Sequence, residues 1–188
     1  ISDYLGANHL NIVVAVRCYN EEKNVNRFID GYSFADRIVI SDGGSSDRSV
    51  ELIKNHPLYE SKIQLLNFEH YVEIDGHRWN EDAPHINFVL DAAKELKPNW
   101  LIFDDFDCIP TKRLKESAVG LFDALLFPKI GENIYYQVNA FRLYLWGDDK
   151  YFPKMNNYFD PAYTSLWAWR PDCQNIYADS SVKHGTLL

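Results

Sequence analysis

Three carboxylates crowd into four consecutive positions in the middle of the chain. Asp104, Asp105 and Asp107 directly follow the apolar run "WLIF" (100–103), where a buried strand would reach the surface. Like charges this close repel one another unless a positive partner offsets them. In an extended segment residues i and i+2 point the same way, so Asp105 and Asp107 are placed to share one divalent cation, Mg²⁺ or Mn²⁺. The alternative is a solvated loop in which Asp107 or Thr111 caps the next helix.

Two further polar segments also follow apolar runs. The run "NIVVAV" leads into Arg17, Tyr19 and Glu21, and the run "RIVIS" leads into Asp42 and Gly43. A carboxylate such as Asp42 at a strand end is suited to accept hydrogen bonds from a base or a ribose. Gly43, without a side chain, allows the backbone to approach a ligand closely. The alternative is an ordinary strand-to-helix turn. There is no GxGxxG sequence and no Walker A lysine, so dinucleotide and P-loop sites lack their main support.

Predicted strands and helices alternate along the first part of the chain, and these elements must position the polar residues. Apolar runs predict strands, and apolar residues at helical spacing predict helices. The predicted strands are 11–19, 36–44, 62–68 and 99–105, and the predicted helices are 21–32, 45–56, 84–97 and 111–127. This alternation predicts an α/β fold, with a mostly parallel central sheet and flanking helices. Because ligands bind at the carboxyl ends of parallel strands, we expect the three polar segments to meet at one edge.

Polar residues at the predicted helix starts suggest caps. Asn20 is the predicted N-cap of the first helix, with Glu21 and Glu22 in its first turn, where the helix dipole favours negative charge. Asp47 is the predicted cap of the second helix. The proline residues Pro57 and Pro98 stand where the second and third helices are expected to stop.

The back of the chain is different in character. From about residue 131 the sequence becomes aromatic and strand-like (133–149) and then irregular (150–171). Its 188 residues suit one well-cored domain better than two. We therefore predict a single domain over 1–188, with an α/β first half at 1–130 and an irregular, aromatic-rich second half at 131–188.

Charge and cysteine content narrow the class of protein. The formal net charge of −8 argues against a general nucleic-acid binder. The three cysteines are widely separated and form no CxxC, which argues against a disulfide framework or a zinc cluster and suits a reducing compartment. No apolar stretch is long enough for a transmembrane segment. These features predict a cytoplasmic protein, either free or peripheral to the inner face of a membrane.

Three segments, taken in order, carry a family resemblance. "VVAVRCYNEEKNV", "ADRIVISDGGSSDRS" and "WLIFDDFDCIPTKRL" resemble the GT-A fold glycosyltransferases of family 2, and more narrowly the lipopolysaccharide-core glucosyltransferase type. The match spans residues 11–116 in order and spacing. The resemblance implies a nucleotide-sugar donor, with UDP the favoured nucleotide, and a Mn²⁺ or Mg²⁺ ion held by a D-x-D sequence. It also implies a glycan or lipid-linked glycan as acceptor.

The resemblance assigns the metal site by position. Asp105 and Asp107 form the D-x-D, with Asp107 the firmer ligand and Asp105 also bordering the nucleotide. His184, near the end of the chain, completes the metal site, so 131–188 becomes the acceptor-binding and metal-completing half. Two residues of this segment depart from the family pattern: Cys108 stands where many members carry Glu or Asp, and Asp104 is an additional acid.

The resemblance also assigns the nucleotide site, which makes 1–130 the nucleotide-binding half. Tyr19, Glu21 and Asp42 border the base and the ribose, beside Gly43 and Arg17. Arg17 stands where a small residue or proline is common in the family. Arg78 is assigned a contact with the diphosphate, and its alternative is an ordinary surface arginine.

The family's inverting chemistry requires a general base on the face of the sugar opposite the leaving group. Asp149 is the preferred candidate, followed by Asp148 and Asp160, and each is also readily explained as a loop acid. Two other activities remain open: a nucleotidyltransferase of related scaffold, although "CYNEEKNV" lacks the Gly-rich basic loop, and a non-catalytic nucleotide- or carbohydrate-binding module. A glycoside hydrolase is disfavoured, because two acids two residues apart on one strand cannot flank a sugar.

Overall fold

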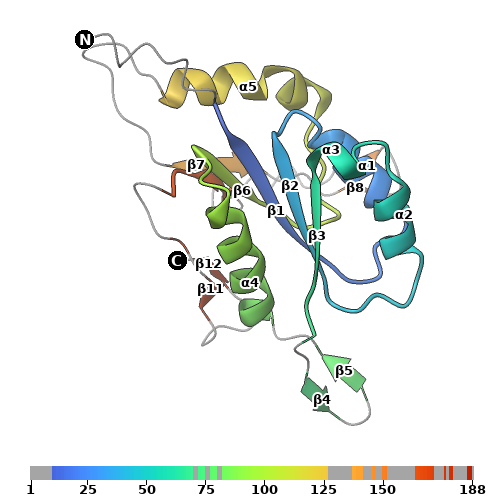
Figure 1. Ribbon diagram of the computed structural model, residues 1–188. Coiled ribbons are helices and arrows are strands. Elements are labelled where there is room, and N and C mark those ends of the chain that lie inside the picture. Colours follow the sequence, from blue (N-terminus) through green and yellow to red (C-terminus); the bar gives the residue numbers. More distant parts are fainter. Residues whose placement is uncertain are drawn as a thin grey trace.

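One mixed sheet forms the centre of the protein (Figure 1). The computed structural model describes residues 10–69, 72–74, 77–79, 82–126, 137–141, 145–146, 150–151, 164–171, 176, 178–179 and 186–187. Within these residues six strands pair in the order β3-β2-β1-β6-β10-β7. They are β1 (Ile12–Cys18), β2 (Arg37–Asp42), β3 (Ile63–Asn67), β6 (Trp100–Phe103), β7 (Gln137–Phe141) and β10 (Thr164–Trp169). The first four in this order are parallel, and β10 is antiparallel to both of its neighbours.

Helices cover both faces of the sheet (Figure 1). They are α1 (Val25–Gly31), α2 (Ser49–Asn55), α3 (Tyr59–Lys62), α4 (Asp82–Glu95) and α5 (Lys112–Leu126). Because side chains alternate along a strand, β1 feeds two separate cores. Ile12, Val14 and Val16 pack with α1, α2 and α5, whereas Val13 and Ala15 pack with α4. The result is a three-layer α/β/α arrangement, as the alternation of strands and helices predicts.

Among the described residues, three short antiparallel strand pairs lie outside the main sheet. They are β4 (Val72–Ile74) with β5 (His77–Trp79), β8 (Leu145–Trp146) with β9 (Lys150–Tyr151), and β11 (Ala178–Asp179) with β12 (Thr186–Leu187). The β4–β5 pair projects away from the sheet in Figure 1. It occupies the polar connection between β3 and α4.

The predicted fold class is confirmed, with differences at particular elements. Strand β6 ends at Phe103, so the acidic residues follow the strand rather than forming its last part. Helix α1 begins at Val25, and its N-cap is Asn24, so the prediction of Asn20 as N-cap with two glutamates in the first turn is wrong. The segment "TSLWAW", predicted to be irregular, is strand β10, which joins the sheet in the antiparallel direction.

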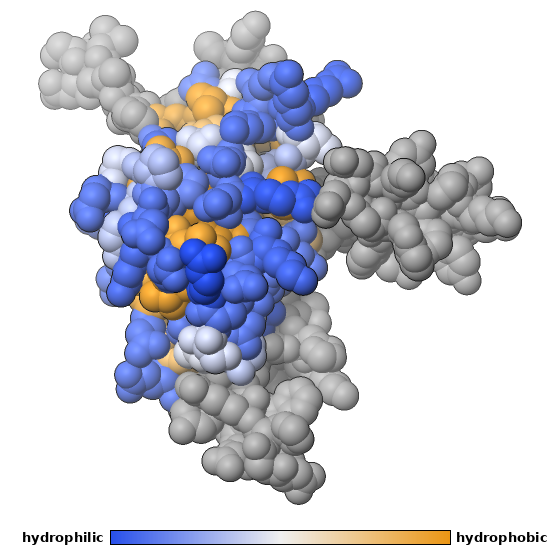
Figure 2. Space-filling model, turned by 90° about the vertical axis from the view of Figure 1, so that its right-hand side faces the viewer, coloured by the Kyte–Doolittle hydropathy of each residue, from blue (hydrophilic) through white to orange (hydrophobic). Residues whose placement is uncertain are grey.

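The visible surface is mostly hydrophilic on the face shown in Figure 2, where hydrophobic patches are small and separated by polar residues. Among the described residues, the large hydrophobic side chains that remain exposed are Tyr19, Phe88, Val119 and Leu121. No described helix has both the length and the apolar character needed to cross a bilayer.

The buried strands make a direct prediction about stability. Ile38 of β2 is fully buried in the core under α1 and α2. We expect Ile38→Ala to lower the free energy of unfolding by about 2–5 kcal/mol, because the residual cavity adds to the lost burial. Val119→Ala on α5 serves as control, since this side chain is 48% exposed, and should change it by less than about 0.5 kcal/mol. Urea unfolding of the two variants measures the difference, and equal effects would contradict the assigned core.

Candidate functional site

The three polar segments meet at one edge of the sheet because of strand pairing. Strand β1 lies between β2 and β6 and is parallel to both, so the carboxyl ends of all three strands point the same way. Cys18 pairs with Asp42, and Ala15 pairs with Phe103. Because β6 stops opposite Ala15, the acidic turn that follows it lies beside the last residues of β1. The predicted convergence of these segments is therefore confirmed.

The acidic segment forms a tight turn with two different sides. The N–H of Cys108 donates to the carbonyl oxygen of Asp105 at 2.9 Å, which closes the turn. Asp104 and Phe106 are buried, whereas Asp105 is half-buried and Asp107 is exposed. The segment is not extended, yet Asp105 and Asp107 are still the two acids that solvent reaches.

The cap of the following helix is Thr111 rather than Asp107. The Thr111 hydroxyl accepts the N–H of Leu114 at 3.2 Å, in the first turn of α5. The capping alternative raised by the sequence therefore applies to Thr111. This leaves the Asp107 carboxylate exposed at the sheet edge, without a capping role at that helix.

Arg17 lies beside the acidic turn. Its guanidinium Nη2 is 3.6 Å from Oδ1 of Asp105, with the two side chains 25% and 44% exposed. The pair follows from the unequal lengths of β1 and β6, which place the end of β1 next to the turn. Arg17 thus offsets part of the negative charge, and it supplies a cation at the edge where the nucleotide site is predicted.

Asp42 shapes the turn after β2. Its Oδ2 accepts the N–H groups of Gly44 and Ser45, at 2.9 and 3.0 Å, and its Oδ1 accepts the Ser45 hydroxyl at 2.5 Å. Gly44 has a φ of 85°, a left-handed conformation that glycine adopts without strain. The N–H of Gly43 donates to the carbonyl oxygen of Cys18, at 2.8 Å, and so extends the β1–β2 ladder. Asp42 therefore holds the turn, and its predicted contact with a nucleotide stays a prediction.

Asn20 joins the loop after β1 to the loop after β2. It has a left-handed φ of 57°, which asparagine tolerates better than most residues. Its side-chain oxygen accepts the N–H groups of Ser46 and Asp47, at 2.8 and 3.3 Å, and its own N–H donates to the Ser45 hydroxyl at 2.9 Å. Asn20 is thus a cross-link between loops, which is why it does not cap α1.

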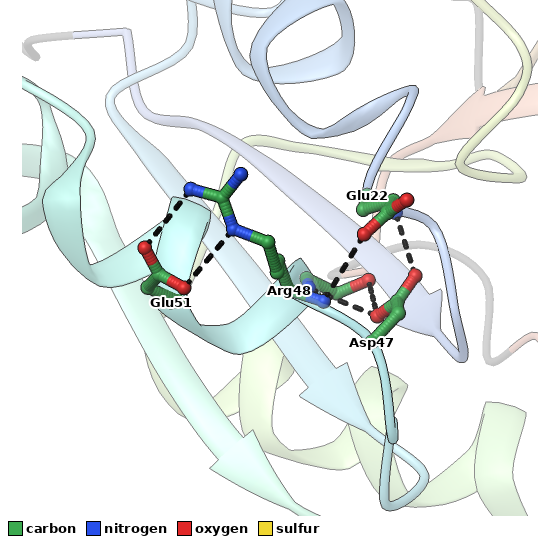
Figure 3. A network of polar contacts seen from close by, with 5 residues as sticks. Glu22, Asp47, Arg48 and Glu51 are labelled. Atoms are coloured by element: carbon green, nitrogen blue, oxygen red, sulfur yellow. Dashed lines mark hydrogen bonds and ion pairs between the residues drawn. The ribbon is translucent and has the colours of Figure 1, made fainter.

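Glu22 and Asp47 continue this cross-link toward α2 (Figure 3). The Asp47 carboxylate accepts the N–H of Glu22 at 3.0 Å and the N–H of Ser49 at 2.9 Å, and the Glu22 carboxylate accepts the N–H of Arg48 at 3.3 Å. Arg48, the N-cap residue of α2, makes no side-chain cap and instead pairs with Glu51. The predicted cap at Asp47 is therefore displaced by one residue, although its carboxylate still serves the start of the helix.

The raised pKa of Glu21 shows that carboxylates of different loops interact electrostatically. Burial raises the pKa of Glu21, a hydrogen bond from Asn24 opposes this, and the charges of Asp107, Asp47 and Asp105 raise the pKa further. The Glu21 N–H also donates to the hydroxyl of Ser49, at 2.7 Å. Carboxylates from the loops after β1, β2 and β6 thus form one region of negative potential.

Two buried residues at this edge have structural roles. Burial, together with the Asp42 charge, raises the pKa of the Cys18 thiol to about 12, so this cysteine is no nucleophile near neutral pH. His85 of α4 places its Nε2 atom 2.9 Å from the hydroxyl of Ser41 and stacks its ring on Phe68, with centroids 4.3 Å apart. His85 is therefore a buried, hydrogen-bonded side chain that packs α4 against the end of β2.

Asp104 is the residue whose role the sequence does not reveal. Its Oδ2 accepts the hydroxyl of Tyr32, and its Oδ1 accepts the N–H of Asp105 at 3.0 Å. The sequence signal is faint: Tyr32 follows Phe28 by one helical turn, and Asp104 precedes Phe106 by the strand period. These four residues meet on one side of the turn.

Several predicted site residues lie outside the described part of the chain, namely Asp148, Asp149, Asp160 and His184. Arg78 belongs to strand β5, and its side chain is not described. The general base, the diphosphate contact and the third metal ligand therefore stay predictions.

The described residues offer a pair of ligands for a divalent cation. No group of three or more His, Cys, Asp or Glu residues positioned to hold a metal ion occurs among them. Asp105 and Asp107 nevertheless stand solvent-accessible in a region whose negative potential raises the pKa of Glu21. Mg²⁺ and related cations often bind through one or two carboxylates together with substrate phosphates. The donor set fits such an ion.

Asp47 makes a prediction about pH. Partial burial raises the pKa of Asp47, but hydrogen bonds from Ser49 and Glu22 outweigh it, so the pKa lies below the ordinary value of 3.8. The stabilisation is therefore complete above pH 3.8 and is lost as the pH falls through the folded-state pKa. We expect Asp47→Ala to lower the free energy of unfolding by about 0.5–2 kcal/mol at pH 7, and the difference from the wild type to shrink toward pH 3.

Urea unfolding at several pH values between 7 and 3 measures this difference. Asp123→Ala, at an exposed position on α5, is the control and should change the free energy by less than about 0.5 kcal/mol throughout. A constant difference between the wild type and Asp47→Ala across this range would contradict the assigned hydrogen bonds.

Comparison with known proteins places the fold. No protein-family model matches the chain, and no curated protein matches it in sequence. The crystal structure of S. aureus TarS residues 1–349, a GT-A-like glycosyltransferase, matches with a TM-score of 0.53 and 16% identity, over 93% of this chain and 52% of that one. The structure of the same protein in complex with UDP matches equally. Glucosyl-3-phosphoglycerate synthase from Mycobacterium tuberculosis gives a TM-score of 0.44 at 20% identity, over 64% of this chain and 41% of that one, a likeness too distant to support an argument.

At these identities the likeness shows the fold alone. The chain spans about half the length of the TarS structure that it matches. Its mostly parallel sheet with flanking helices is the fold of GT-A-like glycosyltransferases.

Proposed function

We propose that the chain is a metal-dependent glycosyltransferase that moves a sugar from a nucleotide-sugar donor, a UDP-sugar, to an acceptor hydroxyl with inversion. One observation carries the proposal. On a sheet with this fold, Glu21, Asp42, Asp105 and Asp107 gather where three parallel strands end. This is the edge at which open α/β sheets bind ligands.

The loops after β1 and β2 supply the nucleotide side of the site. Tyr19 is 44% exposed at this edge, next to the cross-linking Asn20, so an aromatic face is available to a base. The turn held by Asp42 leaves the half-buried Gly44 without a side chain, so a ligand can approach the backbone closely there. Because the two loops are joined by hydrogen bonds, this surface is formed before a ligand arrives. Preorganisation of that kind lowers the entropic cost of binding.

The turn after β6 supplies the phosphate side of the site. Asp105 and Asp107 would hold Mn²⁺ or Mg²⁺, with His184 as the predicted third ligand. The cation's contribution is to neutralise the negative charge that develops on the departing nucleoside diphosphate. Arg17, beside Asp105, adds a second positive charge at the same edge.

The acceptor side rests on the second half of the chain. Asp149, Asp148 and Asp160 remain the candidates for the general base that takes the proton of the acceptor hydroxyl. A glycan or a lipid-linked glycan is the proposed acceptor. The proposal of donor binding does not depend on which of the three acids acts.

The donor is tested with a panel of UDP-, GDP-, dTDP- and CMP-sugars, each with Mn²⁺, measuring thermal stabilisation and hydrolysis of the sugar nucleotide. We expect stabilisation by a UDP-sugar only when the metal is present. At a ligand concentration about 100 times Kd, binding adds about 2.7 kcal/mol to the free energy of unfolding. Absence of stabilisation by every sugar nucleotide would overturn the proposal.

The metal ligands are tested with matched variants. We expect Asp107→Asn, and to a smaller extent Asp105→Asn, to remove the Mn²⁺-dependent stabilisation, because an amide loses the charge that binds the cation. Asp123→Asn on α5 makes the same chemical change at an exposed site and should leave the stabilisation intact. Isothermal titration of Mn²⁺ in the presence of UDP gives the affinities. Unchanged binding by Asp107→Asn would show that the metal is held elsewhere.

Product analysis, with a UDP-sugar or with UTP and a sugar phosphate as substrates, separates the other candidate activities. A transferase releases UDP from the UDP-sugar, whereas a nucleotidyltransferase releases pyrophosphate from UTP and a sugar phosphate. A binding module is stabilised by the sugar nucleotide and releases neither product. Release of pyrophosphate, or binding without turnover with any acceptor, would replace the proposed function.

A further inference from the structure

We propose that α1 and the residue after it, Tyr32, position the acidic turn, and that Tyr32 acts through Asp104 to set the placement of Asp105 and Asp107. The inference rests on the proposed function, because it treats Asp105 and Asp107 as the ligands of a divalent cation. Tyr32 is thus a positioning residue.

Alternate residues of the turn are fixed to this helix. The hydroxyl of Tyr32 donates to Oδ2 of Asp104, which is 6% exposed. The ring of Phe106 stacks on that of Phe28, with centroids 4.6 Å apart and planes at 27°. Phe28 in turn contacts the ring of Tyr32, with centroids 4.7 Å apart. The inward side of the turn therefore rests on two aromatic residues one helical turn apart.

Two further contacts link α1 to the residues that follow the turn. Gly31, the last residue of α1, lies so close to the segment after the turn that a Cβ atom there would be 3.0 Å from Cδ of Pro110 and 3.3 Å from Cγ2 of Ile109. Lys115 of α5 donates from Nζ to the carbonyl oxygen of Asp30, at 2.6 Å. Helix α1 thus contacts the segment both within the turn and after it.

Electrostatic repulsion explains why the turn needs to be held by these contacts with α1. Three carboxylates in four residues repel one another, and in a loop without restraint they would separate. The Tyr32 hydroxyl holds Asp104 inward, and Asp104 accepts the N–H of Asp105 at 3.0 Å with its other oxygen. The Asp104 carboxylate is thereby held away from those of Asp105 and Asp107, and it orients the backbone of Asp105. Outer partners of this kind typically contribute 10–100-fold to metal affinity.

The first variant of the test removes only the hydroxyl group of Tyr32. We expect Tyr32→Phe to weaken Mn²⁺ binding, titrated in the presence of UDP, by about tenfold, because Asp104 loses the donor that holds it inward. Tyr59→Phe is the matched control: Tyr59 on α3 packs partly buried against the same core, so the substitution should leave the affinity unchanged.

A second variant tests the same segment by steric displacement. We expect Gly31→Ala to weaken Mn²⁺ binding as well, because its Cβ displaces Pro110 and Ile109 by a few tenths of an ångström. Gly120→Ala on α5 is the matched control, since a Cβ there meets no described atom within 4 Å. It should leave the affinity unchanged and raise the melting temperature slightly.

A readout without metal separates positioning from general destabilisation. Amide hydrogen exchange of the metal-free protein reports on two turn hydrogen bonds, from Asp105 N–H to Asp104 and from Cys108 N–H to Asp105. We expect Tyr32→Phe to speed exchange at these two amides while amides of β1 and β2 keep their protection. The double variant Tyr32→Phe/Asp104→Asn should bind Mn²⁺ no more weakly than Asp104→Asn alone, because residues acting in series are not additive.

Each outcome decides between the inference and the function on which it rests. If the wild type binds Mn²⁺ with UDP and Tyr32→Phe binds equally well, the inference is wrong and the proposed function stands. If Tyr32→Phe weakens binding only together with general loss of protection in β1 and β2, positioning is also refuted. If the wild type binds no Mn²⁺, the proposed function fails, and exchange at Asp105 and Cys108 still decides whether α1 holds the turn.

Discussion

Parallel pairing of β1 with both β2 and β6 is the constraint on which the rest of the site depends. It places three polar segments at one edge, and each segment brings carboxylates. The strand register then determines which residues lie next to one another at this edge. Since β6 ends opposite Ala15, the acidic turn lies against the end of β1, which puts Arg17 within 3.6 Å of Asp105. The fold thus creates a concentration of negative charge that local structure has to accommodate.

The protein accommodates that charge by engaging some acids and leaving others accessible. Asp42, Asp47 and Asp104 each accept hydrogen bonds from nearby N–H or O–H groups. These bonds stabilise carboxylates that repulsion would otherwise disfavour. Asp105 and Asp107 stay accessible to solvent, and their charges add to the burial that raises the pKa of Glu21. The acids therefore divide into those that hold the loops in shape and those that remain accessible to solvent at the predicted site.

Much of the fold could be predicted from the sequence, because burial imposes periods that the sequence displays. The β-branched runs of β1 and β2 and the helical spacing of α4 and α5 are examples. Strand β10 was missed because "TSLWAW" lies in an aromatic region without a clean alternation, and its place is set by pairing with β6 and β7. The gathering of the site residues followed from the fold class. The roles of Asn20, Tyr32 and Asp104 did not, because they depend on contacts between segments far apart in the chain.

The alternation within the acidic turn has a consequence for how this region can vary in length. Asp104 and Phe106 face α1, while Asp105 and Asp107 face solvent, so neighbouring positions have opposite requirements. Removing or adding one residue before Phe106 would exchange the two sides, exposing an aromatic ring and driving a carboxylate into the space that the ring fills. The number of residues between β6 and α5 is therefore restricted: a single substitution changes one side chain of the turn, whereas a shift of one position changes the environment of several acids at once.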